Sequence, residues 1–260
     1  MKKEFFVPDA ILPSDNELEI PTLRLDKQPR FCDRPFVLFG EQRRTMDMKG
    51  TGVLHFYTDD YRFNSIYEHP EKIINHNPGA IIEPNFSLFH ETPVAFGMQA
   101  VYKKRFIGRI MQDYGINVYV DLNVDTKFYK LNLIGIPRGY ASFATRGYAD
   151  RLENLMFEYE LAKYIANGNQ MIFVVYGGGY SIQDFCKRNG LIYVAPVVSF
   201  KTKATKIEKI KERLKETVSF FGQEIDAKTL LGNKQMELPS FEEMLEQSQV
   251  QDYSKQITSK

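Results

Sequence analysis

Short apolar runs recur between residues 50 and 200 and alternate with segments of helical periodicity. Glycine, proline, asparagine and aspartate bound the runs, as is typical of strands buried in a sheet. The strands expected are 53–58, 79–83, 117–122, 141–146, 171–176 and 191–198, with 128–136 as an additional one. Strands that alternate with helices predict right-handed crossovers and an α/β fold with a mostly parallel sheet of about six strands. The strand–helix alternation covers about 150 residues, whereas a complete eight-fold barrel typically needs about 250. An open sheet or an incomplete barrel is therefore favoured.

The pattern also predicts two long helices. Thr92-Pro93 is a typical helix start, and the helix after it is expected to end near Gly115. Its apolar stripe, expected to face the core, is Ala95, Met98, Tyr102, Phe106 and Ile110. A second amphipathic helix is expected to begin near Asp150 and to stop at Asn167.

The two ends of the chain have a different character. Frequent prolines in residues 1–49 forbid a long helix and predict an extended arm, with a short strand at 36–39. Residues 201–260 read as a basic amphipathic helix followed by a polar tail. We therefore expect an N-terminal arm (1–49), an α/β core domain (50–200) and a C-terminal extension (201–260).

Composition narrows the class of protein. The chain has 260 residues, of which 43% are hydrophobic, enough for a full core. Lys plus Arg number 34 against 33 Asp plus Glu, so any nucleic-acid surface has to be local. No apolar run approaches the roughly 18 residues of a membrane span, which predicts a cytoplasmic protein with no membrane partner. Cys32 and Cys186 stand far apart, against a disulfide scaffold or zinc ribbon.

The stretch from Gly79 to Phe89 is the first place where a site is expected. After the apolar strand, Glu83, Asn85 and Ser87 follow at a spacing of two and point the same way if the backbone is extended. The carboxyl ends of parallel strands are where α/β folds bind ligands. The acids expected there, as catalytic residues or as ligands of a divalent cation, are Asp59, Asp60, Glu83 and Asp121. The same carboxylates also suit helix capping.

Two further groups of residues are candidates for binding. The residues expected near the strand ends are Asn85, Ser87, Asn123, Arg146, Tyr176, Gly177, Gly178 and Gly179. The three glycines could present backbone amides to a phosphate, but they match no known phosphate loop, and the sequence favours a tight turn. Basic side chains expected to contact nucleic acid are Lys103, Lys104, Arg105, Arg109, Lys206, Lys209 and Arg213. Solvated surface is the alternative interpretation of these cations.

A set of short motifs carries a resemblance to a known family. HFYTDDYRF, EPNFSLF followed by ETP, IMQDYGINVYVDLN, GIPRG and VVYGG resemble, in this order, the family called domain of unknown function 4417. The resemblance covers roughly residues 50–195 and leaves both ends outside. Asn85 stands where the family pattern commonly has aspartate. The family occurs in phages and mobile elements, which implies a role near DNA but no established activity.

Three functions are therefore open from the sequence. The first is a phage- or mobile-element-type protein that acts on or beside DNA or RNA, for example in replication. The second is a hydrolase-like enzyme that uses the strand-end carboxylates with a divalent cation. The third is an assembly protein whose arms contact other copies or other phage proteins.

Overall fold

The computed structural model of the chain describes residues 12–41 and 48–196. Nearly all of them belong to one compact unit, which ends at Val194 in this part of the chain. The expected C-terminal helix and tail, with Lys206, Lys209 and Arg213, lie outside the described residues, as do residues 1–11.

Seven parallel strands form one sheet whose spatial order is the order of the chain. The strands are β1 (Phe36–Leu38), β2 (Val53–His55), β3 (Ala80–Ile82), β4 (Asn117–Asp121), β5 (Ser142–Arg146), β6 (Ile172–Tyr176) and β7 (Ile192–Val194). This confirms the expected parallel α/β fold and the strands expected between residues 50 and 200, except 128–136. It also places β1, inside the expected arm, in the sheet.

The sheet curls until it is nearly closed as a barrel, so the incomplete barrel is the correct one of the two expected forms. One apolar cluster draws buried side chains from all seven strands, from Phe36 on β1 to Val194 on β7. The rings of His55 on β2 and Tyr176 on β6 lie 4.4 Å apart, centroid to centroid, although four strand pairings separate their strands. The barrel interior is therefore filled with side chains.

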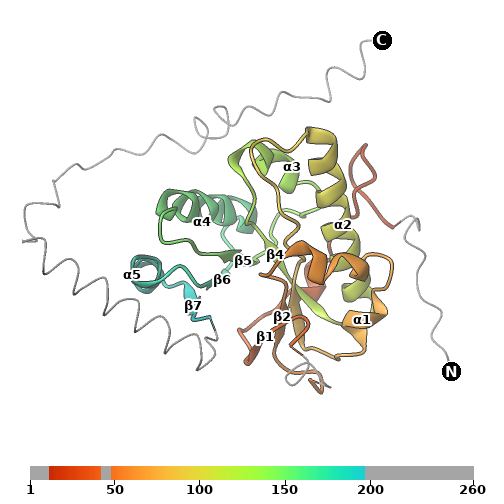
Figure 1. The fold of residues 1–260 in the computed structure, drawn as a ribbon, viewed down its shortest axis with the longest axis horizontal. Helices are drawn as coiled ribbons and strands as arrows, with labels where there is room; N and C mark the ends of the chain where they lie inside the picture. The colour runs from red at the N-terminus through yellow and green to blue at the C-terminus, as the bar shows by residue number, and fades with distance from the viewer. Residues whose placement is uncertain (1–11, 42–47, 197–260) are drawn as a thin grey trace, which may run out of the picture. The chain divides into compact units, whose positions relative to one another are not determined.

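Helices cover the outside of the sheet (Figure 1). They are α1 (Glu71–Ile74), α2 (Val94–Asp113), α3 (Tyr129–Asn132), α4 (Leu152–Ala166) and α5 (Tyr180–Asn189). Short 3-10 turns, η1 (Leu25–Lys27), η2 (Asp60–Arg62), η3 (Asn64–Ile66) and η4 (Thr126–Phe128), occupy the connections. Two outer apolar clusters join helices to strands, one around Ile107 of α2 and the other around Leu161 of α4.

Three local expectations are wrong. Residues 128–136 form the end of η4, α3 and a turn at Gly135, where φ is +76°, and not a strand. Thr92 does not cap α2; its Oγ1 accepts a hydrogen bond from the Phe89 amide at 3.1 Å. The stripe expected on α2 is wrong at Ala95, which is exposed, and incomplete, because the buried face contains Lys104 and Arg105 besides the expected Phe106 and Ile110.

The described part of the N-terminal arm is packed against the body. Gln112 of α2 binds it on both sides: its Oε1 accepts from the Arg24 amide at 2.6 Å, and its Nε2 donates to the carbonyls of Arg24 and Lys27 at 3.1 and 3.0 Å. Ser142, at the amino end of β5, donates to the Pro29 carbonyl at 2.6 Å. The arm thus lies across the amino ends of the central strands, opposite the ends that carry ligand sites in this class of fold.

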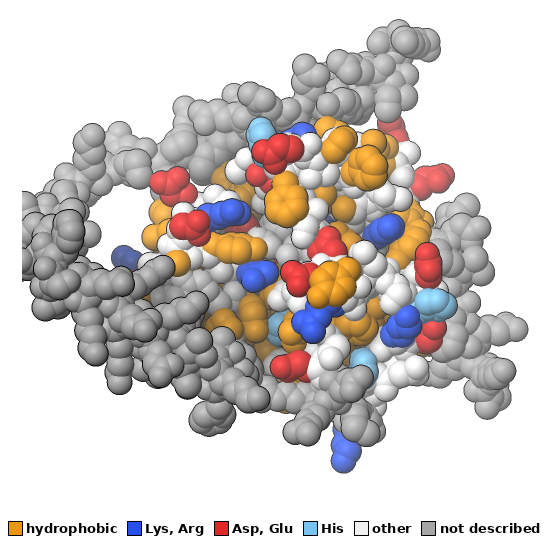
Figure 2. All heavy atoms as spheres, viewed as in Figure 1, with side chains coloured by type: hydrophobic (Ala, Val, Ile, Leu, Met, Phe, Trp, Pro, Cys, Tyr) orange, Lys and Arg blue, Asp and Glu red, His pale blue; other side chains and the backbone are white. Residues whose placement is uncertain are grey.

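The surface offers no broad patch of one charge on the face seen in Figure 2, where cationic and acidic side chains are interspersed. This agrees with the balanced charge of the chain. Among the helices within residues 12–41 and 48–196, none combines the length and the apolar character that crossing a bilayer requires.

Candidate functional site

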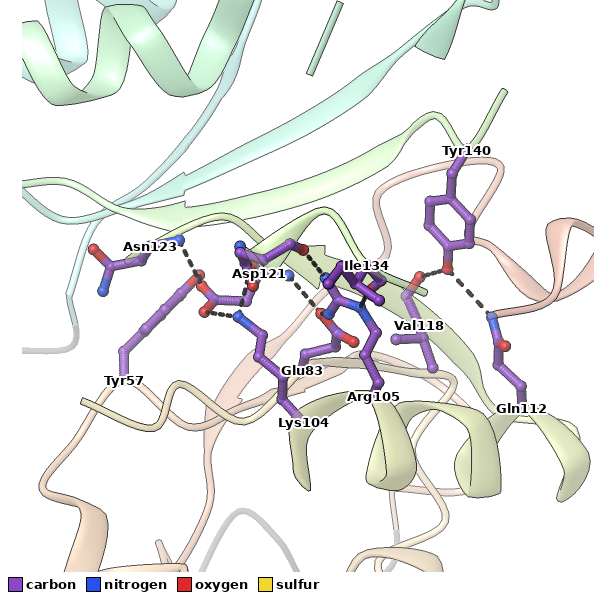
Figure 3. Close-up of polar contacts among 11 residues, drawn as sticks. Tyr57, Glu83, Lys104, Arg105, Gln112, Val118, Asp121, Asn123, Ile134 and Tyr140 are labelled. Carbon is purple, nitrogen blue, oxygen red and sulfur yellow. Dashed lines mark hydrogen bonds and ion pairs between the residues drawn. The ribbon is translucent and has the colours of Figure 1, made fainter. Parts of the chain in front are cut away.

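Two buried ion pairs fill the space under the carboxyl ends of β3 and β4 (Figure 3). Lys104 Nζ lies 3.1 Å from Asp121 Oδ2 and donates to the Asp121 carbonyl at 2.8 Å. Arg105 pairs with Glu83, and its Nε donates to the Ile134 carbonyl at 3.0 Å. All four charged side chains are almost completely buried. Consecutive residues on one helix therefore neutralise the acids of two neighbouring strands.

Other polar groups connect the two ion pairs. The Tyr57 hydroxyl donates to Asp121 Oδ1 at 3.0 Å, and the Asp121 amide donates to Glu83 Oε2 at 3.1 Å. Burial raises the pKa of Asp121, and the Lys104 ammonium acts in the opposite direction. Burial, with the Asp121 carboxylate next, raises the pKa of Tyr57 well above its usual range. Tyr57 is therefore a neutral hydrogen-bond donor at any physiological pH.

Asn85 and Asn123 connect this network to a cavity. In the amide orientation that satisfies both groups, Asn85 Nδ2 donates to Asp121 Oδ2 at 3.3 Å and to the Asn123 carbonyl at 3.0 Å. Asn85 Oδ1 then accepts from Asn123 Nδ2 at 2.9 Å. Both asparagines line the cavity, so the network forms part of its wall.

The cavity has a volume of about 500 Å³. Its walls are the loop between β3 and α2, the segment after β4, the end of β5 and the first two turns of α4. The residues that line it include Asn85, Phe89, His90, Asn123, Asp125, Arg146, Tyr148, Arg151 and Glu158. This is the carboxyl edge of the sheet, where loops over a rigid sheet form ligand sites.

Two arginines lie near one aromatic ring in this cavity. The guanidinium carbons of Arg146 and Arg151 lie 5.3 and 5.1 Å from the centre of the Tyr148 ring, a separation typical of cation–π contacts. Within residues 12–41 and 48–196, neither guanidinium has a carboxylate oxygen within 4.0 Å. The two positive charges are thus available to an anion that enters the cavity.

Acidic and histidine side chains also lie in or near the cavity. Glu158 of α4 is 3% exposed, and burial raises its pKa well above the ordinary value of 4.5. His90 Nδ1 lies 3.3 Å from Asp125 Oδ1 at the exposed rim. Burial first and then the Arg146 guanidinium lower the pKa of His55 to about 3, so this imidazole, beside the Tyr57 and Tyr176 rings, is neutral.

The four acids expected at one sheet edge do not converge. Glu83 and Asp121 belong to the buried network, whereas Asp60 accepts hydrogen bonds from the Ser87 hydroxyl and amide at 2.9 and 3.0 Å. Asp59 is exposed. In the described part of the chain, no group of three or more histidine, cysteine, aspartate or glutamate side chains is placed to hold a metal ion.

The expected binding residues divide into two groups. Asn85, Ser87, Asn123 and Arg146 line the cavity, whereas Tyr176 and Gly177–Gly179 do not. A Cβ at Gly178 would lie 2.8 Å from the Gly147 carbonyl carbon, so this glycine permits the ends of β5 and β6 to approach. All three glycines of the run have positive φ, so backbone conformation, together with close packing at Gly178, accounts for them.

The cationic side chains of α2 do not form one exposed basic face. Lys104 and Arg105 are buried in the ion pairs, which corrects the expectation that they contact nucleic acid. Lys103 Nζ lies 5.2 Å from the centre of the Tyr67 ring. Arg109 binds Asp113 at 3.2 Å and the Thr22 carbonyl at 2.9 Å. These two are partly exposed and already engaged.

Sequence reasoning missed Arg151, Tyr148 and Glu158. Glu158 carried a signal: it stands three residues after Leu155 and four before Ala162, on the apolar stripe that faces the core. A carboxylate inside such a stripe needs a partner or a function. Arg151 carried no such signal, because an arginine before a helix resembles ordinary surface.

The fold and cavity together define a class: a nearly closed parallel α/β barrel with a polar, arginine-containing cleft at the carboxyl ends of its strands. The chain belongs to the family described as Domain of unknown function (DUF4417), whose model matches residues 12–192. The match extends the resemblance found from the motifs to residues 12–49 of the N-terminal arm.

Two curated relatives come from mycobacteriophages. The "Gene 1 protein" of Mycobacterium phage L5 is 30% identical over 145 residues, which are 52% of this chain and 62% of the relative. The "Gene 1 protein" of Mycobacterium phage D29 is 33% identical over 109 residues, 41% of this chain and 39% of the relative. The aligned regions thus span less than two thirds of either relative. No solved structure matches the chain. The comparisons establish a phage-type protein.

Proposed function

We propose that this phage-type protein binds nucleic acid and that its cleft takes an unpaired nucleotide of the strand. The observation that carries the proposal is the pair of guanidiniums of Arg146 and Arg151 beside the Tyr148 ring. Guanidiniums match phosphate oxygens in geometry and charge, and an aromatic ring beside them suits a base or a sugar.

The size of the cleft supports an unpaired nucleotide. A volume of about 500 Å³ lies within the roughly 300–1,000 Å³ of small-ligand sites. A duplex keeps its bases stacked inside, so a pocket of this kind accepts a nucleotide only from a single strand or from a flipped position. Phe89 at the rim is 65% exposed and offers a stacking surface for a neighbouring base. Replication, which exposes single strands, is the setting that we propose.

The geometry favours binding over the hydrolase alternative. Glu83 and Asp121, two of the acids on which the hydrolase alternative depends, each have a buried cationic partner. For the assembly alternative, residues 12–41 of the arm give no support, because they pack on their own body. In the nucleic-acid hypothesis, Arg146 and Arg151 of the cleft therefore replace the cations of α2 as the expected contacts.

Binding of a fluorescent 20-nucleotide single strand and of its duplex, measured by anisotropy between 50 and 200 mM salt, tests the proposal. We expect the single strand to bind more tightly. In the double variant Arg146→Met and Arg151→Met, the slope of log K against log salt should decrease by about one for each phosphate that is no longer neutralised. Arg138→Met is the matched control, since Arg138 is exposed and does not line the cavity.

Two results would contradict the proposal. One is an absence of binding by the wild-type protein at 50 mM salt. The other is a double variant that binds with the affinity and salt dependence of the Arg138→Met control. Circular dichroism of each variant establishes that the fold is intact.

A further inference from the structure

Glu158 is an acidic side chain in an unusual position, because it lines a cavity that contains two arginines yet forms no ion pair with them. No lysine, arginine or histidine nitrogen in the described part of the chain lies within 4.0 Å of its carboxylate oxygens. It is 3% exposed and projects from α4 toward β5, where Thr145 is its polar neighbour. Tyr129, whose buried hydroxyl has no hydrogen-bond partner in the described residues, is also near it.

The surroundings of Glu158 favour its uncharged form. Burial is the largest influence that raises its pKa; the Asp121 carboxylate raises it further, while Thr145 and Lys104 act against them. The ionisable groups around it are Tyr57, Lys104, Asp121 and Tyr129 on the protein side and His90, Glu91, Asp125, Arg146, Tyr148 and Arg151 in the cavity. Burial without a cation within 4.0 Å among the described residues thus favours the carboxylic acid, which has an O–H to donate.

The uncharged form has two consequences for a phosphate ligand. A carboxylate at this place would repel the phosphate and would compete with it for the guanidiniums. A carboxylic acid leaves both positive charges to the ligand and adds a donor, and an O–H bonded to an anionic oxygen is among the shorter and stronger hydrogen bonds in proteins. A carboxyl held neutral by its environment is an established way to donate a hydrogen bond at pH 7.

We propose that Glu158 recognises the nucleotide as a neutral acid, donating its O–H to a non-bridging phosphate oxygen held by Arg146 and Arg151. This inference rests on the proposed function and adds a specificity to it. Because the Glu158 O–H needs a hydrogen-bond acceptor, the cleft should select a phosphate group over a ligand group that can only donate hydrogen bonds. No bond is made or broken in this step, and the proton stays on Glu158.

The experiment measures the affinity for the fluorescent 20-nucleotide single strand from pH 6 to 9.5 in the wild type and in Glu158→Gln and Glu158→Ala. Glutamine keeps the shape and a donor N–H but cannot ionise. We expect Glu158→Gln to bind within a few-fold of the wild type at neutral pH, and Glu158→Ala to bind about 10- to 100-fold more weakly, the range for a hydrogen bond to a charged group. Glu153→Gln, an exposed change on the same helix, is the control.

The pH profile separates this role from a structural one. Any decrease of the wild-type affinity that ionisation of Glu158 causes at alkaline pH should be absent from Glu158→Gln, whose affinity should stay level over the same range. The inference is overturned if Glu158→Ala binds like the wild type, or if Glu158→Gln shows the same alkaline decrease. If Glu158→Ala fails to fold, the glutamine profile decides alone. No binding by the wild type would instead refute the proposed function, a result distinct from both.

Discussion

Lys104→Met tests whether the buried ion pair with Asp121 is essential to the fold. The ammonium approaches Asp121 Oδ2 at 3.1 Å, and the two side chains are 3% and 0% exposed. Methionine preserves most of the aliphatic volume of lysine, so the substitution removes chiefly the charge and its hydrogen bonds. The Asp121 carboxylate would then be buried without a counter-charge.

The expected magnitude follows from what remains around Asp121. Its Oδ1 keeps the Tyr57 hydroxyl at 3.0 Å, and its carbonyl keeps Asn132 Nδ2 at 3.1 Å, so the main loss is electrostatic. Removing one partner of a buried pair costs about 3–5 kcal/mol. That is a large part of the roughly 5–15 kcal/mol by which domains are stable. Because Lys104 no longer lowers its pKa, Asp121 should protonate more readily, and the deficit should shrink as the pH falls.

Urea unfolding, extrapolated linearly to water at pH 5 and pH 8, measures this free energy. Lys103→Met, one residue away and partly exposed, should cost less than about 1 kcal/mol. In the double variant Lys104→Met with Asp121→Asn, removal of the orphaned charge should restore part of the loss. A Lys104→Met protein within 1 kcal/mol of the Lys103→Met control at pH 8 would refute the reasoning.

Three further changes have defined outcomes. Gly97→Ala would place a Cβ 2.3 Å from the buried Phe128 ring and should cost about 1–3 kcal/mol in urea unfolding, whereas Gln99→Ala on the exposed face should not destabilise. Gln112→Met removes three hydrogen bonds to the arm and should accelerate amide exchange there selectively; uniform exchange would contradict this anchoring. Because the folded-state pKa of Glu158 is raised, its contribution to stability should fall as pH rises above 4.5, by up to about 1.4 kcal/mol per pH unit, a slope that Glu158→Gln should lack.

The fold was predictable to the extent that short-range patterns determine it. Buried apolar runs and the Asn167 stop, where φ is +51°, identified most strands and the end of α4. The strand predicted at residues 128–136 was wrong because an apolar run is compatible with a short helix as well as with a strand. Tertiary contacts decide which of the two forms.

The site was less predictable because it depends on which residues meet across the sheet. Lys104 and Arg105 look like surface cations in a sequence, and only the positions of Asp121 and Glu83 beneath α2 make them internal. Asn85 and Asn123 were recognised from their strand ends, since that rule depends on topology alone. Arg151, by contrast, becomes a site residue only through the path of the chain after β5.

The strictly sequential strand order has a consequence for how the chain folds during synthesis. Each strand pairs with the one made just before it, so the sheet can grow from its N-terminal edge as the chain leaves the ribosome. Every member of the network around Asp121 and Glu83 lies at or before Ile134. The charged centre can therefore assemble while β5 to β7 are still to be translated, and the later strands then close the barrel over partners already neutralised.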